Sequence, residues 1–183
     1  RDNLFIPQIS TWCQTPAYQI IIAPPYRVCY ILDTMETEKI DFIDGGTVTS
    51  PRGFRAGATA AGIKKKAKPA LDLGILFSEV PCVVAGVLTT SRIKSAPIII
   101  CQERLAKGRA VAIVANSGCA NAYTGEQGII NANEMAASAA FALGCKPEDV
   151  FVASTGVTGQ PLPIDLIKAG VRQIALSTEG GHE

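Results

Sequence analysis

Hydrophobic residues in this chain are grouped into short runs, which polar residues, glycines and prolines separate. Apolar runs of four to eight residues with such boundaries are typical of buried β-strands. The pattern predicts strands over residues 73–77, 83–88, 98–101, 110–115 and 150–153.

Two later segments have the spacing of amphipathic helices instead. In residues 136–143, alanines and a leucine recur at i, i+3, i+4 and i+7, and Gly144 follows as a helix stop. The second helix follows Pro163, which suits the first helical position, and residues 164–174 place their isoleucines and valine on one stripe. Four predicted strands precede the first helix, so strict βαβ alternation is absent, and we expect an α+β fold of mixed layers.

The composition changes near Met35. All 17 glycines lie at or after Gly45, whereas the first 34 residues are rich in aromatic side chains. We therefore expect residues 1–34 to be a non-native or disordered upstream extension, and residues 35–183 to form the folded domain. The alternative is a short accessory β segment, because residues 18–32 are rich in strand-forming side chains.

The formal charge of +1 provides no overall field that would attract nucleic acid or a membrane surface. No apolar stretch approaches the ~20 residues of a membrane span, and we find no signal peptide. The six cysteines include no CxxC pair, which indicates a reducing compartment, and we expect a cytoplasmic protein. His182 is the only histidine and lies next to the end of the chain, which disfavours a zinc site or a Ser/His/Asp mechanism.

Residues 154–163 read Ser-Thr-Gly-Val-Thr-Gly-Gln-Pro-Leu-Pro and follow an apolar run. A strand that stops at a Thr-Gly turn before a helix leaves backbone N–H groups unpaired. Such donors can hold a phosphate or the oxyanion of an acyl-transfer intermediate. No Gly-Lys-Ser/Thr follows and no GxGxxG occurs, so the Walker interpretation lacks its lysine and its magnesium hydroxyl. The residues alone leave open an acyl-transfer site and a phosphate- or nucleotide-binding α/β module.

Other segments have both a structural and a chemical interpretation. Residues 116–125 are dense in small polar side chains, which can build a tight turn or line a pocket. Within them, Cys119 has no histidine or nearby cation to activate it, which favours a packing residue. The lysines of 64–68 can grip a phosphate, although such a run is more often a solvated loop. Residues 89–92 can bring hydroxyls and a guanidinium to a pocket.

Five segments, taken in order, resemble the glutamate N-acetyltransferase/ornithine acetyltransferase family of arginine biosynthesis. They are Gly-Gly-Thr-Val-Thr-Ser-Pro-Arg-Gly-Phe (45–54), Ala-Ala-Gly-Ile-Lys-Lys (60–65), Thr-Thr-Ser-Arg-Ile-Lys-Ser-Ala-Pro (89–97), residues 116–125 and residues 154–163. Residues 1–34 match nothing in that family.

The resemblance implies a layered α/β sandwich in a precursor that cleaves itself at an Ala-Thr bond into α and β chains, which assemble as α2β2. The threonine that begins the β chain is the nucleophile, and its free α-amine is a sensible base. It takes an acetyl group from N-acetylornithine and passes it to glutamate; some members also accept acetyl-CoA. The resemblance implies no cofactor.

In the family the Thr-Gly pair forms the oxyanion hole, which carries over to Thr155 and Gly156. Cys119 stands where the family often has asparagine. The sequence given ends at Glu183, before the family's Thr-Thr-Asp segment and its cleavage site. The resemblance therefore implies an α-chain portion that supplies the oxyanion hole, lacks the nucleophile and is inactive without the β chain.

The expectation for residues 1–34 can be tested by N-terminal sequencing of the natively expressed protein. We expect the mature chain to begin at or near Met35. A mature start well before Met35 would contradict it.

Overall fold

The computed structural model describes residues 21–23, 27–29, 45–65 and 69–179. The chain divides into two units, Arg1–Phe42 and Ile43–Glu183. In the first unit, β1 (Ile21–Ala23) and β2 (Arg27–Cys29) form an antiparallel pair, in agreement with the alternative of a short β segment. Most of the expected extension, residues 1–34, lies outside the described residues, so the expectation of a non-native segment stays a prediction.

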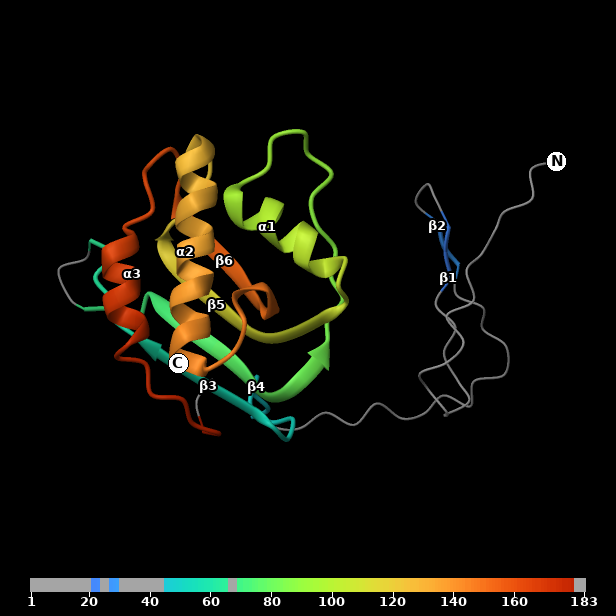
Figure 1. The fold of residues 1–183 in the computed structure, drawn as a ribbon, viewed down its shortest axis with the longest axis horizontal. Helices are drawn as coiled ribbons and strands as arrows, with labels where there is room; N and C mark the ends of the chain where they lie inside the picture. Colours follow the sequence, from blue (N-terminus) through green and yellow to red (C-terminus); the bar gives the residue numbers. More distant parts are fainter. Residues whose placement is uncertain (1–20, 24–26, 30–44, 66–68, 180–183) are drawn as a thin grey trace. The chain divides into compact units, whose positions relative to one another are not determined.

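The second unit contains a four-stranded mixed sheet (Figure 1). In spatial order its strands are β3 (Phe54–Thr59), β4 (Leu73–Val83), β5 (Arg109–Cys119) and β6 (Val150–Val157). The first two pairs are antiparallel, and β5 pairs with β6 in parallel. A parallel pair needs a long crossover connection, which here contains a 19-residue helix.

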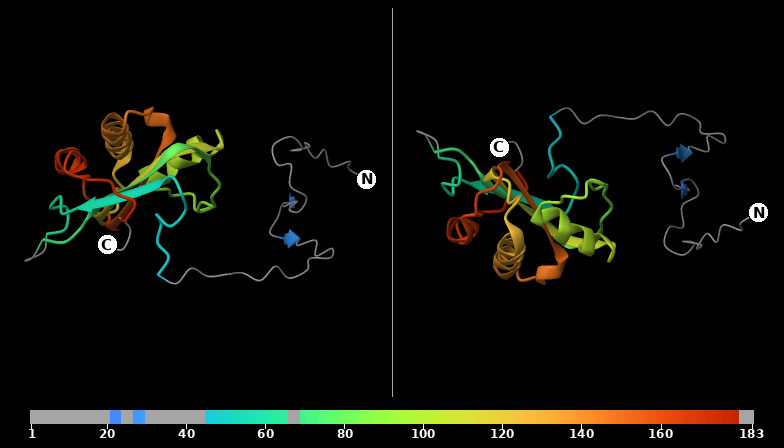
Figure 2. Two further views of the ribbon diagram at one scale, coloured as in Figure 1. Left: turned by 90° about the horizontal axis from the view of Figure 1, so that it is seen from below. Right: turned by 90° about the horizontal axis from the view of Figure 1, so that it is seen from above.

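Three helices accompany the sheet: α1 (Ala96–Leu105), α2 (Gly125–Leu143) and α3 (Ile164–Val171). In Figure 2, α2 and α3 lie on one side of the sheet. The predicted stop of α2 is confirmed, because Gly144 caps it in the left-handed conformation with a φ of 68°. The 3-10 turn η1 (Pro147–Asp149) then leads into β6.

The core lies between the helices and the face of the sheet that they cover. Its most buried side chains include Leu73, Val114, Met135, Val150 and Ile167. The confirmed helices contribute their apolar stripes, and the confirmed strands contribute alternate residues. The α+β fold of mixed layers is therefore confirmed.

The other face of the sheet is also apolar. Leu76, Ile113 and Phe151 lie side by side in the register of β4, β5 and β6, and Phe151 is buried. Ile113 remains 40% exposed. In the described part of the chain no helix covers this face (Figure 2).

Two predicted strands are wrong. Residues 98–101 belong to α1, because Pro97 begins a helix and the helical spacing buries Ile100, Cys101 and Arg104 together. Of residues 83–88 only Val83 is in a strand: β5 begins at Arg109, which pairs with Val83, so the following residues have no partner strand.

Strand β3 was not predicted. Its sequence, Phe-Arg-Ala-Gly-Ala-Thr, has little of the β-branched and aromatic character that marks a strand. It forms because the edge of β4 offers a pairing partner from Leu73 to Ser78.

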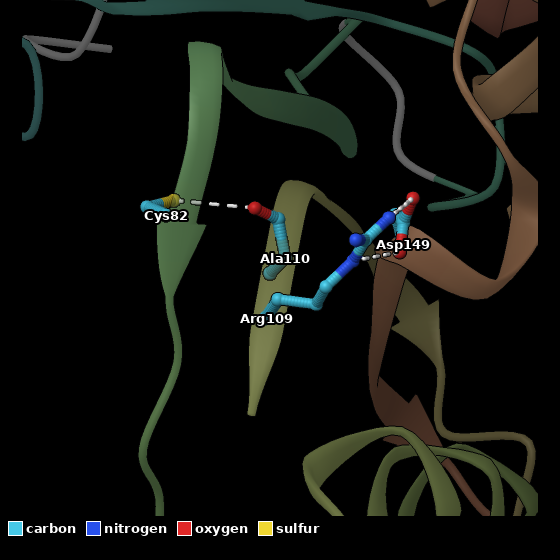
Figure 3. A network of polar contacts seen from close by, with 4 residues as sticks. All are labelled: Cys82, Arg109, Ala110 and Asp149. Carbon is cyan, nitrogen blue, oxygen red and sulfur yellow. Dashed lines mark hydrogen bonds and ion pairs between the residues drawn. The ribbon is translucent and has the colours of Figure 1, made fainter. Parts of the chain in front are cut away.

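Polar contacts fix the end of the sheet at which β5 starts (Figure 3). The Arg109 guanidinium donates to both carboxylate oxygens of the buried Asp149, at 3.3 and 3.2 Å, and this bond raises the pKa of Arg109. On the β4 side, the Cys82 thiol donates to the Ala110 carbonyl at 3.4 Å. These contacts hold the start of β5 between β4 and the turn that precedes β6.

No helix in the described residues is both long enough and apolar enough to span a bilayer.

The packing of β3 gives a testable prediction. A Cβ at Gly57 would lie 2.2 Å from the Ala175 carbonyl oxygen, so Gly57→Ala must displace the segment after α3. We expect a loss of about 1–3 kcal/mol in the free energy of unfolding, as for other overpacked sites. Urea unfolding of the purified chain measures it.

Gly74→Ala is the matched control, because Gly74 lies in the neighbouring strand and its Cβ would meet nothing closer than 3.5 Å. This change should be neutral or stabilise by up to about 1 kcal/mol, since alanine loses less backbone entropy than glycine. Equal effects of the two substitutions would contradict the proposed clash.

Candidate functional site

The candidate residues Thr155 and Gly156 lie at the carboxyl end of the parallel pair β5/β6. The ladder continues from Asn116 opposite Ser154 to Cys119 opposite Val157. Thr155 and Gly156 are therefore part of β6, and the expectation that the strand stops at the Thr-Gly pair is wrong. The strand extends because residues 117–119 continue β5 and supply a partner. The helix expected after Pro163 is confirmed as α3, which begins at Ile164.

The outer edge of β6 is shared between α1 and solvent. The carbonyl of Val150 accepts a bond from the Arg104 guanidinium, and that of Val152 accepts one from the Cys101 thiol at 3.2 Å. The Val157 carbonyl instead accepts from the Ala120 N–H at 2.9 Å, on the β5 side.

Successive residues of a strand direct their backbone groups to opposite edges. The Val150 and Val152 carbonyls are directed to α1 and the Val157 carbonyl to the β5 side, and from this alternation we infer that the Gly156 amide is directed to the outer edge. Thr155, Gly156 and Val157 are all exposed, so α1 does not cover this part of the edge. The Thr155 side chain lies on the face of the sheet opposite the buried Val150 and Val152.

Glycine is required at position 156. Its φ is +130°, and a Cβ there would lie 2.3 Å from the carbonyl carbon of Gly118 and 2.6 Å from the amide nitrogen of Cys119. Gly118 has a φ of +114°, and its own Cβ would lie 3.1 Å from the backbone of Ile63 and Lys64. Three backbone segments thus stack directly on one another, with no side chain between them.

A buried aspartate fixes the Ile63–Lys64 segment of this stack. The carboxylate of Asp72, which is 3% exposed, accepts from the amides of Ala61 at 2.7 Å and Lys64 at 2.8 Å. Its carbonyl accepts from the Ser117 amide at 2.8 Å. Sequence reasoning missed this residue, although a single acidic residue between Leu71 and Leu73 was a usable signal.

The polar segment 116–125 mainly builds turns. Asn121 is fully buried in the left-handed conformation; its side chain donates to the Gly128 carbonyl at 2.9 Å and accepts from the Thr124 hydroxyl at 2.8 Å. Its carbonyl accepts from the Ala96 amide at 3.2 Å, which connects the turn to the start of α1. Of the two interpretations of this segment, a tight turn or a pocket wall, the turn is the one that applies to Asn121 and Thr124.

Cys119 is a buried packing residue whose thiol also forms hydrogen bonds. Its thiol donates to the carbonyls of Gln160 at 3.5 Å and Pro161 at 3.8 Å, which fixes the chain that leaves β6. Burial raises the pKa of the Cys101 thiol, which keeps it protonated as a donor to Val152.

The fold brings together four of the five segments singled out in the sequence. Residues 60–65, 89–97, 116–125 and 154–163 are joined by the backbone contacts and hydrogen bonds above. Residues 45–54 lie elsewhere, because Phe54 pairs with Ser78 toward the other end of the sheet.

The remaining candidates do not form a site in the described residues. Lys64 donates through Nζ to the Leu71 carbonyl at 3.5 Å, residues 66–68 lie outside the described part, and residues 89–92 form an exposed loop. No group of three or more His, Cys, Asp and Glu side chains that could hold a metal occurs in that part. Two surface hollows, of about 310 and 380 Å³, are lined by no residue of 154–163.

Comparison with known proteins identifies the family. The sequence profile of the ArgJ family matches residues 55–182. The chain belongs to the ArgJ family. Its relatives include the arginine biosynthesis bifunctional protein ArgJ of Dehalococcoides mccartyi, which is 52% identical over 144 residues, and that of Symbiobacterium thermophilum, which is 50% identical over 146 residues.

Each alignment covers 79% of this chain and 36% of the relative, so the chain spans about a third of the length of these proteins. Among solved structures, ArgJ of Bacillus halodurans superposes with a TM-score of 0.71 at 39% identity, over 76% of this chain and 73% of that one. The ornithine acetyltransferase of Mycobacterium tuberculosis, solved with ornithine, gives 0.70 at 40% identity, over 74% of each chain.

The glycine contact predicts the effect of Gly156→Ala. The substitution needs a φ that costs an L-residue about 1–3 kcal/mol and adds a clash with the Gly118–Cys119 peptide. We expect the free energy of unfolding to fall by at least that amount. The Ala120 amide should also exchange with solvent faster, because it donates to the carbonyl of Val157, which follows Gly156 in the chain.

Gly159→Ala serves as the control. Gly159 has a φ of +74° but open space around its Cβ position, so only the backbone strain of about 1–2 kcal/mol applies. A larger loss of stability in Gly159→Ala than in Gly156→Ala would contradict the idea that the contact of Gly156 with the Gly118–Cys119 peptide adds to the cost of the substitution.

Proposed function

We propose that this chain is the α-chain part of an acetyltransferase that moves an acetyl group from N-acetylornithine to glutamate in arginine biosynthesis. Thr155 and Gly156 form its oxyanion hole. The observation that carries the proposal is that Thr155 and Gly156 lie next to each other, both exposed, at the carboxyl end of the edge strand β6 in a member of the ArgJ family. The relative solved with ornithine supports the same class of substrate.

The reaction proceeds through an acetylated threonine. The hydroxyl of a threonine outside these 183 residues attacks the acetyl carbonyl, and its α-amine accepts the proton. The carbonyl oxygen becomes negatively charged and accepts hydrogen bonds from the Thr155 hydroxyl and the Gly156 amide. The carbon–nitrogen bond then breaks, and ornithine leaves with the proton on its amine. The amine of glutamate attacks the acetyl-threonine, the ester carbon–oxygen bond breaks, the threonine hydroxyl is restored by the proton that the amine loses, and N-acetylglutamate leaves. Acetyl-CoA is a possible second donor of the same acetyl group.

The position of the donors suits this task. A donor contributes to catalysis when it is held in place before charge develops, because no energy is then spent on reorganisation. The backbone of Gly156 packs against that of Gly118, and in the described part of the chain no strand pairs with the outer edge of β6. Both donors are uncharged, which suits a charge that appears only transiently.

We propose that the β chain of the same precursor covers the helix-free face of the sheet in an α2β2 assembly. That face carries Leu76 and the 40% exposed Ile113 beside the already buried Phe151, and the relatives are almost three times as long as the matched region. An apolar sheet face in a layered fold is normally packed against a further layer. We expect autocatalytic cleavage to produce the two chains in the cytoplasm.

The alternative is a phosphate- or nucleotide-binding module. Phosphate loops place several amides of a helix N-terminus around the ligand. Here Gly156 lies in a strand and α3 begins at Ile164, so the local geometry favours the acyl site. Tight nucleotide binding that Gly156→Ala abolishes, without acetyl transfer by the protein that includes the β chain, would favour the alternative.

The experiment that tests the proposal measures acetyl transfer from N-acetylornithine to glutamate. The protein that contains this chain together with its β chain should be active, whereas residues 1–183 alone should be inactive because they lack the nucleophile. Thr155→Ala should lower kcat by about 10²–10³, the usual effect of removing one oxyanion donor. KM should change little, because the bond strengthens only as charge develops.

Thr158→Ala is the matched control, an exposed threonine three residues further along the chain. Its kcat should stay within twofold of the unchanged protein. Activity of residues 1–183 alone would place the nucleophile within this chain, and equal activities of the two alanine variants would remove Thr155 from the mechanism.

A further inference from the structure

Two buried polar atoms next to the candidate site have no hydrogen-bond partner among the described residues: the Oδ1 atom of Asn116 and the Oγ atom of Ser154. Buried polar groups in folded proteins are nearly always hydrogen-bonded, so each such exception needs an explanation. Asn116 and Ser154 lie directly opposite each other in the parallel register of β5 and β6. Two exceptions at one register position point to one shared cause.

The Asn116 side chain cannot remove the exception by turning its amide group over. Its Nδ2 atom donates to the Cys119 carbonyl at 2.9 Å, and the residue is 3% exposed. Exchanging the two ends of the amide would place Oδ1 against the Cys119 carbonyl oxygen, and two acceptors repel each other. Oδ1 therefore needs a donor from elsewhere.

The neighbouring positions on the same face of the sheet supply no side-chain donor. Alternate residues of a strand share a face, so the preceding pair on this face is Val114 opposite Val152, and both side chains are apolar and buried. The next pair is Gly118 opposite Gly156, which has no side chains. The two oxygens therefore lie between an apolar pair and a pair that fills no side-chain volume.

A water molecule has the size and the bonding capacity for this position. Neighbouring strands lie about 4.8 Å apart, and the two oxygens do not bond to each other. One water that makes two O–H···O bonds of about 2.8 Å at a tetrahedral angle spans about 4.6 Å. It supplies the donor that Oδ1 lacks, and Oγ can donate to it or accept from it. Buried waters in proteins typically bind such otherwise unsatisfied groups.

We propose that one buried water molecule bridges Asn116 Oδ1 and Ser154 Oγ and is part of the structure of the β5/β6 strand end. The Asn116 amide is then held at both ends, by the water and by the Cys119 carbonyl. The Gly118–Cys119 peptide, against which Gly156 packs, is fixed by the same side chain. The site is a property of this chain and does not depend on the proposed function.

The first test is a crystal structure of the 183-residue chain at a resolution that shows ordered water. We expect density for one water within hydrogen-bond distance of both Asn116 Oδ1 and Ser154 Oγ. No density at this position, or a Ser154 hydroxyl that bonds directly to another protein group, would overturn the proposal. Density at the shorter distances of a metal ion, about 2.0–2.6 Å, would also overturn it.

The second test compares Ser154→Thr with Ser154→Val, because threonine and valine have nearly the same shape and differ in one hydroxyl. Ser154→Thr should still bind the water in its crystal structure, whereas Ser154→Val should lose it. The urea midpoint of unfolding should be about 1 M lower for Ser154→Val than for Ser154→Thr, because Asn116 Oδ1 then stays buried without a donor.

Thr158→Val is the matched control, since it makes the same hydroxyl-to-methyl change at an exposed position and should leave the midpoint unchanged. Equal midpoints for Ser154→Thr and Ser154→Val would overturn the bridge, as would a water that keeps its position in Ser154→Val. If neither variant folds, Ser154→Ala, which creates space instead of filling it, replaces them and should also lower the midpoint. An unchanged midpoint in Ser154→Ala would then overturn the proposal.

Discussion

The structure around the candidate site depends on the direct contact between two backbones, that of Gly156 in β6 and that of Gly118–Cys119 in β5. No Cβ fits between them, and both glycines have a positive φ that other residues rarely adopt. This contact lets the parallel ladder continue to Val157, beyond the point at which a Thr-Gly sequence would normally end a strand. The exposed positions of Thr155 and Gly156 follow from this extension.

The same contact links the conformations of segments that lie far apart in the sequence. The turn of residues 60–65 packs on Gly118, and Asp72 holds that turn through two amides. Asn121 and Cys119 fix the loops that leave β5 and β6. A change in any one of these layers would move the next, because backbone packed on backbone has no flexible side chain to absorb the displacement.

The sequence was sufficient for elements whose pattern is strong and local. The alanine spacing and Gly144 define α2, and the apolar runs locate the cores of β4, β5 and β6. Prediction from the sequence failed where contacts with distant segments determine the secondary structure. The isoleucines of α1 have strand propensity but are buried as a helix, and β3 has weak propensity but an available edge. For the candidate site, the sequence proposed Thr155 and Gly156, whereas the role of Asp72 as an acceptor for the Ala61 and Lys64 amides needed the tertiary structure.

The arrangement of donors also bears on the choice between an acyl and a phosphate ligand. A phosphate carries lasting charge on several oxygens and is usually held by several amides together with a cation. In the described residues, Lys64 lies near the stack but donates to the Leu71 carbonyl, and Arg104 donates to Val150 and Asn133. In the proposed site, Thr155 and Gly156 supply one hydroxyl and one amide, both neutral. Two such donors match a single oxygen that becomes charged only during the reaction, and this is why we favour acyl transfer.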